Sequence, residues 1–139
     1  MVPKLFSGGR FADQRGSLFY NNDFDASIVK RIYLIENAAT DLKRGWQGHK
    51  IEQRWFSAMC GSFTVKLIAI DNWETPSKDV EVFAFSLCSE KLDVLHVPPG
   101  YVSCIQAKEK GSKLLVMADY SFGEIKDEYR LPFDYFEKK

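Results

Sequence analysis

The chain has 139 residues, of which 45% are hydrophobic and 27% are charged, a balance typical of one globular domain over residues 1–139. Its 19 Lys and Arg equal its 19 Asp and Glu in number. A broad nucleic-acid interface usually needs a basic excess, so we expect no nucleic-acid partner. No apolar run approaches the roughly 18 residues of a membrane-spanning helix, so we expect no membrane segment.

The three cysteines, Cys60, Cys88 and Cys104, form no Cys-x-x-Cys or Cys/His metal spacing. Each lies in or beside an apolar run, where a cysteine behaves as a small buried hydrophobic residue. The first ten residues lack the apolar segment of a secretory signal. We therefore expect reduced core cysteines in a cytoplasmic protein, with a disulfide as the less favoured alternative.

Short runs of alternating hydrophobicity, separated by turn residues, dominate the chain and are typical of β-strands. We expect strands over residues 28–35, 55–59, 63–70, 80–87, 92–97, 101–107 and 113–119. Asp, Asn, Pro and Ser in 71–78 predict a loop, and Pro98-Pro99-Gly100 predicts a tight turn. Helical periodicity is weak, and its best candidate is 124–129, with Pro132 as a stop.

Many short strands at this spacing predict an all-β fold, an antiparallel jelly-roll sandwich or barrel with a short helical or irregular C-terminal tail. The mouth of such a barrel can enclose a ligand. The 11 Phe, 6 Tyr and 3 Trp residues suit a β-rich core or a stacking pocket.

The chain has only two histidines. His49 ends the polar segment Arg44-Gly45-Trp46-Gln47-Gly48-His49, which combines a cation, an amide and an imidazole. This segment is either a functional site or a connecting loop with a surface histidine. His96 alternates with Leu92 and Val94, so we expect it to point into the barrel interior as a hydrogen-bonded core residue.

A second candidate is the segment from Asp13 to Tyr20. The Arg15 guanidinium, followed by Gly16, could bind phosphate in a bidentate manner, and Phe19 could stack on a base. An ordinary turn is the alternative.

Several motifs follow one another in an order that resembles the sugar-nucleotide 3,4-ketoisomerase family, the WxcM-like C-terminal domains. That family is related to the dTDP-4-dehydrorhamnose 3,5-epimerases of the cupin superfamily. The motifs are Asp13-x-Arg15-Gly16-Ser17-Leu18, Lys30-Arg31-Ile32-Tyr33, Arg44-Gly45-x-x-x-His49-Lys50, Gly61-Ser62-Phe63 and Val97-Pro98-Pro99-Gly100. The resemblance extends over nearly the whole chain, to the acidic and aromatic C-terminal segment.

The resemblance implies a homodimeric jelly roll that moves the keto group of a dTDP-linked 4-keto-6-deoxy sugar between C3 and C4, with no metal and no cofactor. The implied pathway is bacterial surface-polysaccharide biosynthesis. Catalytic positions would be His49, Tyr33 and Gln47, and Arg15 and Arg44 would hold the diphosphate. Further substrate contacts would be Phe19, Trp46, Tyr101 and Ser103. For Trp46 and Tyr101, packing is an equally open reading.

The chain departs from the family at the catalytic pair. The isomerases carry His-x-His where this chain has Gln47-Gly48-His49, and an amide cannot act as a base near pH 7. Metal cupins have histidines where Gln47 and Ser103 stand, so we expect no catalytic metal. Three hypotheses remain: an isomerase or epimerase, a catalytically degenerate nucleotide-sugar-binding cupin, and a cupin for an unrelated small molecule.

Overall fold

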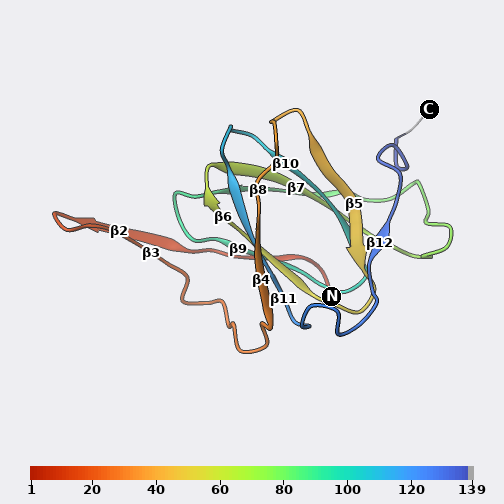
Figure 1. The fold of residues 1–139 in the computed structure, drawn as a ribbon, viewed down its shortest axis with the longest axis horizontal. Coiled ribbons are helices and arrows are strands. Elements are labelled where there is room, and N and C mark those ends of the chain that lie inside the picture. Colours follow the sequence, from red (N-terminus) through yellow and green to blue (C-terminus); the bar gives the residue numbers. More distant parts are fainter. Residues whose placement is uncertain (138–139) are drawn as a thin grey trace.

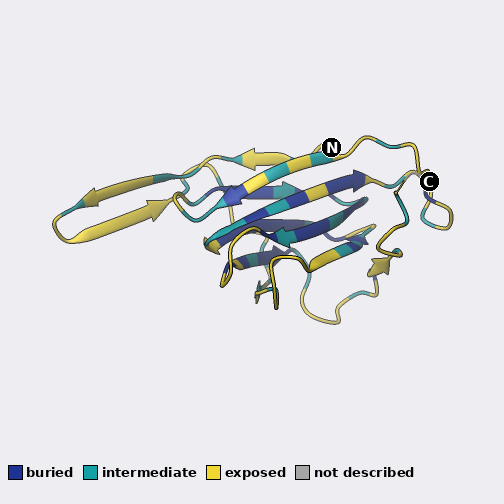
Figure 2. Ribbon diagram, turned by 90° about the horizontal axis from the view of Figure 1, so that it is seen from above, coloured by how far each residue is buried: buried dark blue, intermediate teal, exposed yellow. Residues whose placement is uncertain are grey.

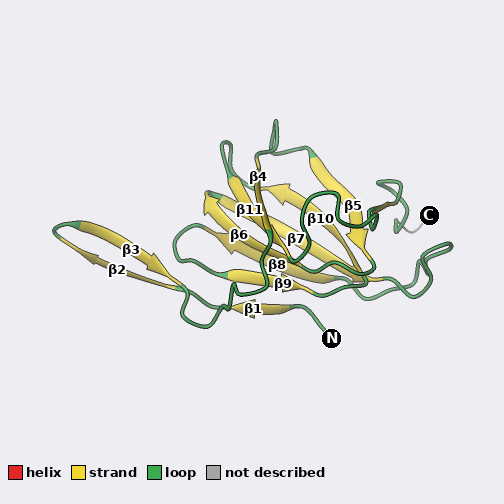
Figure 3. Ribbon diagram, turned by 60° about the horizontal axis from the view of Figure 1, so that its bottom comes forward, coloured by secondary structure: helices red, strands yellow, loops and turns green. Residues whose placement is uncertain are grey.

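The computed structural model describes residues 1–137, and every regular element in that range is a β-strand (Figure 3). No helix in it is long and apolar enough to cross a membrane. One sheet has the order β1 (Lys4–Phe6), β9 (Val94–Val97), β6 (Arg54–Cys60), β11 (Lys113–Ala118) and β4 (Arg31–Ile35). The other has the order β12 (Tyr129–Arg130), β5 (Lys43–His49), β10 (Tyr101–Ala107), β7 (Ser62–Ala69) and β8 (Phe83–Cys88).

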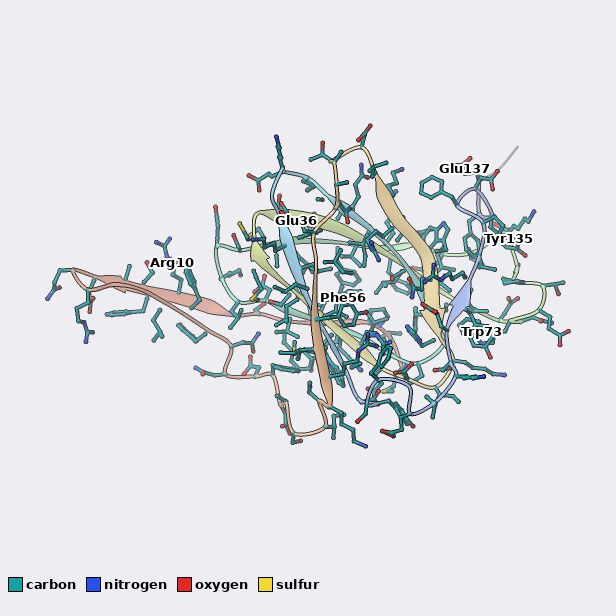
Figure 4. The ribbon with its side chains drawn as sticks, viewed as in Figure 1. Arg10, Glu36, Phe56, Trp73, Tyr135 and Glu137 are labelled. Atoms are coloured by element: carbon teal, nitrogen blue, oxygen red, sulfur yellow. The ribbon has the colours of Figure 1, made fainter. Side chains whose placement is uncertain are left out.

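The two sheets face each other across one apolar core. From β7, Phe63, Val65 and Leu67 are fully buried in it, as the alternation in 63–70 predicts. The facing sheet contributes Phe56, near the centre of Figure 4. All strand pairs are antiparallel. The prediction of an all-β antiparallel sandwich is therefore confirmed.

A second apolar cluster lies on the outer face of the β5–β10–β7 sheet. Trp46 and Ile68 are buried there, and Leu131 and Phe136 of the C-terminal segment pack over them. The Trp46 and Phe136 rings meet edge to face, with centroids 5.2 Å apart. The last described residues thus cover one face of the sandwich.

The predicted helix at 124–129 is wrong. The chain forms turns there and then pairs with the edge of β5 as strand β12. The Leu131 backbone N–H donates to the Trp46 carbonyl oxygen at 2.9 Å. Pairing with the free edge of β5 therefore satisfies the backbone hydrogen-bonding groups of this segment. An isolated helix of six residues would be only marginally stable.

Strands β2 (Gly9–Asp13) and β3 (Gly16–Tyr20) form a hairpin that extends away from both sheets (Figure 1). Its turn holds Arg15, whose backbone N–H donates to Asp13 Oδ1 at 2.9 Å. Most of the hairpin is exposed (Figure 2), including Phe11 at 56% and Leu18 at 61%. In this respect the alternative of an ordinary turn for the Asp13–Gly16 motif agrees with the structure.

Two further expectations are corrected. His96 points outward: Leu95 and Val97 occupy the inner face of β9, so His96 stacks on Trp55, with ring centroids 5.3 Å apart. Its Nε2 lies 2.6 Å from Gln53 Oε1, so the hydrogen bond is present but the interior placement is wrong. Of the three unpaired cysteines only Cys104 is buried; Cys88 is partly buried and Cys60 is exposed.

Candidate active site

A cavity of about 660 Å³ opens between the two sheets. Strands β4, β5, β6 and β10 line it from both sheets, and residues 121–130 line it from the C-terminal segment. Six of the predicted site residues meet here: Tyr33, Arg44, Gln47, His49, Tyr101 and Ser103. Residues that are far apart in the sequence are therefore brought to one site by the sandwich.

A bulge in β5 turns Arg44 into the cavity. Gln47 pairs with Ser103, whereas Arg44 pairs with Ile105, so an extra residue of β5 lies between the two pairs. Strict alternation would put Arg44 and Gln47 on opposite faces, because they are three residues apart. The extra residue places both on the inner face and leaves Trp46 on the outer one.

The glycines of β5 permit its close pairing with β10. A Cβ atom on Gly48 would collide with the Tyr101 carbonyl oxygen and lie 2.7 Å from Val102 Cα. On Gly45 it would lie 2.8 Å from Cys104 Cβ. The glycines therefore serve the approach of one strand to another, and His49 lies in a strand rather than in a connecting loop.

His49 is held in one tautomer. Its Nδ1 lies 2.8 Å from the Asp127 carbonyl oxygen, which can only accept a hydrogen bond, so Nδ1 carries the hydrogen. Nε2 then keeps a free lone pair. Burial, and then the nearby Arg54 charge, hold the pKa of His49 below its usual value, although Glu52 and Asp127 oppose this shift. A neutral imidazole with a free Nε2 can accept a proton.

The Asp127 carboxylate stabilises the turn that follows His49. This carboxylate, in a buried side chain, accepts backbone N–H groups of Lys50, Ile51 and Glu52 at 2.7–3.0 Å. This arrangement fixes the end of β5 to the C-terminal segment, and with it the position of the imidazole.

His49, Glu52 and Asp127 could be mistaken for a metal site, since one ligand atom of each lies within 4.8 Å of the others. However, Glu52 Oε1 already lies 3.2 Å from Arg54 Nη1, and both Asp127 oxygens accept backbone N–H groups. His49 donates through Nδ1. The three side chains therefore already have partners in one another, in backbone groups and in the Arg54 guanidinium. This arrangement suits stabilising the local structure better than binding a metal cation.

Tyr33, Tyr101 and Tyr129 line the cavity. The Tyr101 hydroxyl donates to the Met1 carbonyl oxygen at 3.1 Å, and burial raises its pKa. The Arg31 guanidinium lies over the Tyr33 ring, 4.6 Å from its centroid. Ser103 Oγ donates back to the Gln47 carbonyl oxygen at 3.4 Å. Arg31, Arg44 and Arg54 line the cavity from strands of both sheets.

Gln47 has a partner from the C-terminal segment. Its Nε2 donates to Glu128 Oε1, and the same oxygen accepts from Arg130 Nη2 at 3.0 Å. Tyr129, between these two residues in the sequence, packs on Trp73 with ring centroids 4.6 Å apart. The rim of the cavity is therefore formed by the segment that pairs with β5.

Three predicted substrate contacts lie elsewhere in this chain. Arg15 is in the hairpin turn and pairs with Asp13 at 2.7 Å, and Phe19 lies on the same hairpin below the Arg10 guanidinium. Trp46 is buried on the outer face of its sheet, because the bulge directs it away from the cavity.

Sequence reasoning missed Glu52, Asp127 and Glu128 as parts of this site. The pairing of Glu52 with Arg54 gives no pattern in the sequence. The run from Asp127 to Arg130 stood out as an acidic and aromatic segment. Its contact with β5 joins residues almost 80 positions apart, which no local pattern reveals.

Comparison with known proteins decides the family. The family described as WxcM-like, C-terminal (FdtA) matches residues 3–139. The chain belongs to this family. A comparison of the WxcM-like chain with curated protein sequences finds no match.

Solved structures share the fold of this WxcM-like chain. A variant of the 3,4-ketoisomerase QdtA from Thermoanaerobacterium thermosaccharolyticum, in complex with TDP-4-keto-6-deoxyglucose, matches with a TM-score of 0.72 and 22% identity, over 97% of this chain and 91% of that chain. A 3,4-ketoisomerase from Helicobacter canadensis matches with a TM-score of 0.72 and 23% identity, over 98% and 96%. The rmlC epimerase from Mycobacterium tuberculosis matches with a TM-score of 0.75 and 12% identity, over 95% of this chain and 70% of that chain. At these identities the likeness establishes the fold.

Proposed function

We propose that the protein is an isomerase of a nucleotide-linked 4-keto-6-deoxy sugar, with dTDP as the carrier. The observation that carries this proposal is His49, a neutral imidazole whose Nε2 has no hydrogen-bond partner among residues 1–137, in a cavity that several arginines line. The cavity volume of about 660 Å³ lies in the range of small-ligand sites. The solved ketoisomerase that resembles the chain binds a sugar nucleotide of this kind.

The reaction needs only proton transfer. A base takes the proton from the carbon beside the ketone, the electron pair of the broken C–H bond forms a C=C bond, and the carbonyl oxygen becomes an oxyanion. A guanidinium group in the cavity, such as that of Arg31, stabilises that charge. Return of a proton to the former carbonyl carbon, with transfer of the neighbouring hydroxyl proton to the oxyanion, gives the 3-keto isomer. No oxidant or reductant is consumed, so the proposal includes no cofactor and no metal.

The proposal is tested by following dTDP-4-keto-6-deoxyglucose by NMR. We expect a 3-keto product with the wild-type protein and a rate reduced by about 10²–10⁴-fold in His49→Asn, the effect of losing a general base. His96→Asn is the matched control, because His96 lies outside the cavity. Equal rates in the two variants would refute the role of His49.

A catalytically degenerate nucleotide-sugar-binding protein is the second candidate. Gln47 supports it, because an amide replaces the first imidazole of the family pair. Binding of the sugar nucleotide without any product or proton exchange would favour this candidate over the isomerase.

The proposal includes a homodimer in the cytoplasm, in a pathway of surface-polysaccharide biosynthesis. Support for the dimer comes from the hairpin of β2 and β3, since a two-stranded hairpin is at best marginally stable alone in water. A second copy would cover Phe11, Leu18 and Phe19, which are 41–61% exposed, and would bring Arg15 near its own cavity.

A further inference from the structure

We infer that Glu128 supplies the proton-transfer group that Gln47 cannot. This inference rests on the proposed function and adds a second catalytic residue to it. The isomerisation moves one proton between carbon atoms and another between oxygen atoms. A single imidazole would have to serve both positions, so a second titratable group beside His49 is expected in the cavity.

Strand pairing places Glu128 beside His49 in the cavity. Tyr129 pairs with Gly48 and Arg130 with Gln47 in antiparallel register. On the other side of Glu128, the Asp127 carbonyl oxygen contacts His49 Nδ1 at 2.8 Å. The backbone is therefore tied to β5 on both sides of Glu128, and its carboxylate meets the Gln47 amide.

The other acidic groups of the cavity are already engaged. Asp127 uses both carboxylate oxygens for three backbone N–H groups, and Glu52 is paired with Arg54 and His49. The phenolic hydroxyl of a tyrosine suits a proton donor better than a base at neutral pH.

Glu128 is available by contrast. Its side chain is 51% exposed, and Gln47 and Arg130 both contact Oε1. Within residues 1–137, no hydrogen bond or ion pair involves Oε2, which can therefore face a ligand. A carboxylate with one oxygen held and the other free is a suitable base for a carbon acid.

The step balances without a co-reactant. Glu128 takes the C3 proton, the electron pair of the C3–H bond forms the C3=C4 bond, and O4 becomes the oxyanion beside the arginines. Glu128 then returns a proton to C4, while His49 Nε2 accepts the proton of the C3 hydroxyl and delivers it to the O4 oxyanion. The 3-keto sugar leaves, and both residues regain their starting protonation.

The test is kcat, KM and C3 deuterium exchange for Glu128→Gln, with Glu74→Gln as the matched control in the exposed loop after β7. We expect Glu128→Gln to reduce kcat by at least about 10²-fold with dTDP affinity within about threefold of the wild-type value. The double variant with Gln47→His should recover activity, because an imidazole then stands beside the vacated position.

The outcomes are separable. Wild-type turnover with Glu128→Gln equal to the Glu74→Gln control would overturn the role of Glu128 and leave the proposed function standing. A loss of dTDP affinity in Glu128→Gln that matches the loss of kcat, with no recovery by Gln47→His, would also overturn it and indicate a binding residue. Absence of exchange in the wild-type protein would overturn both proposals.

Discussion

At the residue scale, the chemistry depends on the protonation state of His49. Its side chain is only 12% exposed, and its Nδ1–H is held by the Asp127 carbonyl oxygen. The tautomer therefore follows from the segment that closes over β5, whereas burial and the Arg54 charge favour the neutral state by lowering the pKa of His49. The sequence identified His49 as a candidate, but it could not show which nitrogen is free.

The first prediction concerns pH. The pKa of His49 lies below its usual value because of burial and the Arg54 charge, so the neutral base persists as the pH falls to about 6.5, the ordinary histidine value. We expect kcat/KM to stay level from pH 7.5 to about 6.5 and to fall only below that. An acid limb with an apparent pKa above about 7 would contradict this assignment, as would a profile unchanged in His49→Asn.

The second prediction concerns Arg44. If its guanidinium holds the diphosphate, Arg44→Ala should weaken dTDP binding about tenfold or more, because a hydrogen-bonded charge pair is lost. Lys43→Ala is the control, with the same change of charge one position earlier on β5 and outside the cavity. Calorimetry showing equal affinity for both variants would exclude Arg44 as the anchor.

At the element scale, strands with regular alternation could be predicted and irregular ones could not. The inner positions of β7, such as Val65 and Leu67, follow the pattern of the sequence. Strand β5 gave no such signal, because two glycines and the bulge between Arg44 and Gln47 interrupt its alternation. Strand β12 is only two residues long and exists because β5 offers a free edge.

The third prediction tests the close pairing of β5 and β10. Gly48→Ala should lower the free energy of unfolding by about 1–3 kcal/mol, because the added methyl group collides with the β10 backbone. Ala84→Val adds carbon atoms at an exposed position of β8 and should change stability by less than about 0.5 kcal/mol. Urea unfolding curves that do not separate the two variants would contradict this account.

The fourth prediction concerns the hairpin of β2 and β3. Replacing Phe11 and Leu18 by Glu should convert the dimer into a monomer in light scattering, since it places charges in the proposed contact between copies. The sandwich lies apart from the hairpin (Figure 1), so thermal unfolding of this variant should remain cooperative. A wild-type monomer, or a variant that stays dimeric, would refute the role of the hairpin.

At the scale of the whole molecule, the sequence predicted the sandwich and the residues that meet in its cavity. The core alternation and the ordered motifs are spread along the chain, so both could be read before any contact was known. Arg15 and Phe19, by contrast, lie outside the cavity, on the hairpin of β2 and β3, most of which is exposed in a single chain. The placement of Glu128 beside β5 could be recognised only from the three-dimensional path of the C-terminal segment.

The fifth prediction links pH to stability. Burial lowers the pKa of both His49 and His96, so near pH 6 the unfolded chain binds more protons than the folded protein. Their contribution to stability is present above about pH 6.5, the ordinary histidine value, and is lost as the pH falls through the lower folded-state pKa values. The melting temperature of a His49→Asn, His96→Asn double variant should fall less than that of the wild type between pH 7.5 and 5.5. Parallel curves would contradict this.

The most direct test of the central claim is proton NMR of dTDP-4-keto-6-deoxyglucose with the wild-type protein in D₂O. The account predicts loss of the C3 proton signal together with a 3-keto product, and no 3-keto product in His49→Asn. A C3 signal that persists while the thymidine resonances broaden would contradict it, since the protein would then bind the sugar nucleotide without moving a proton.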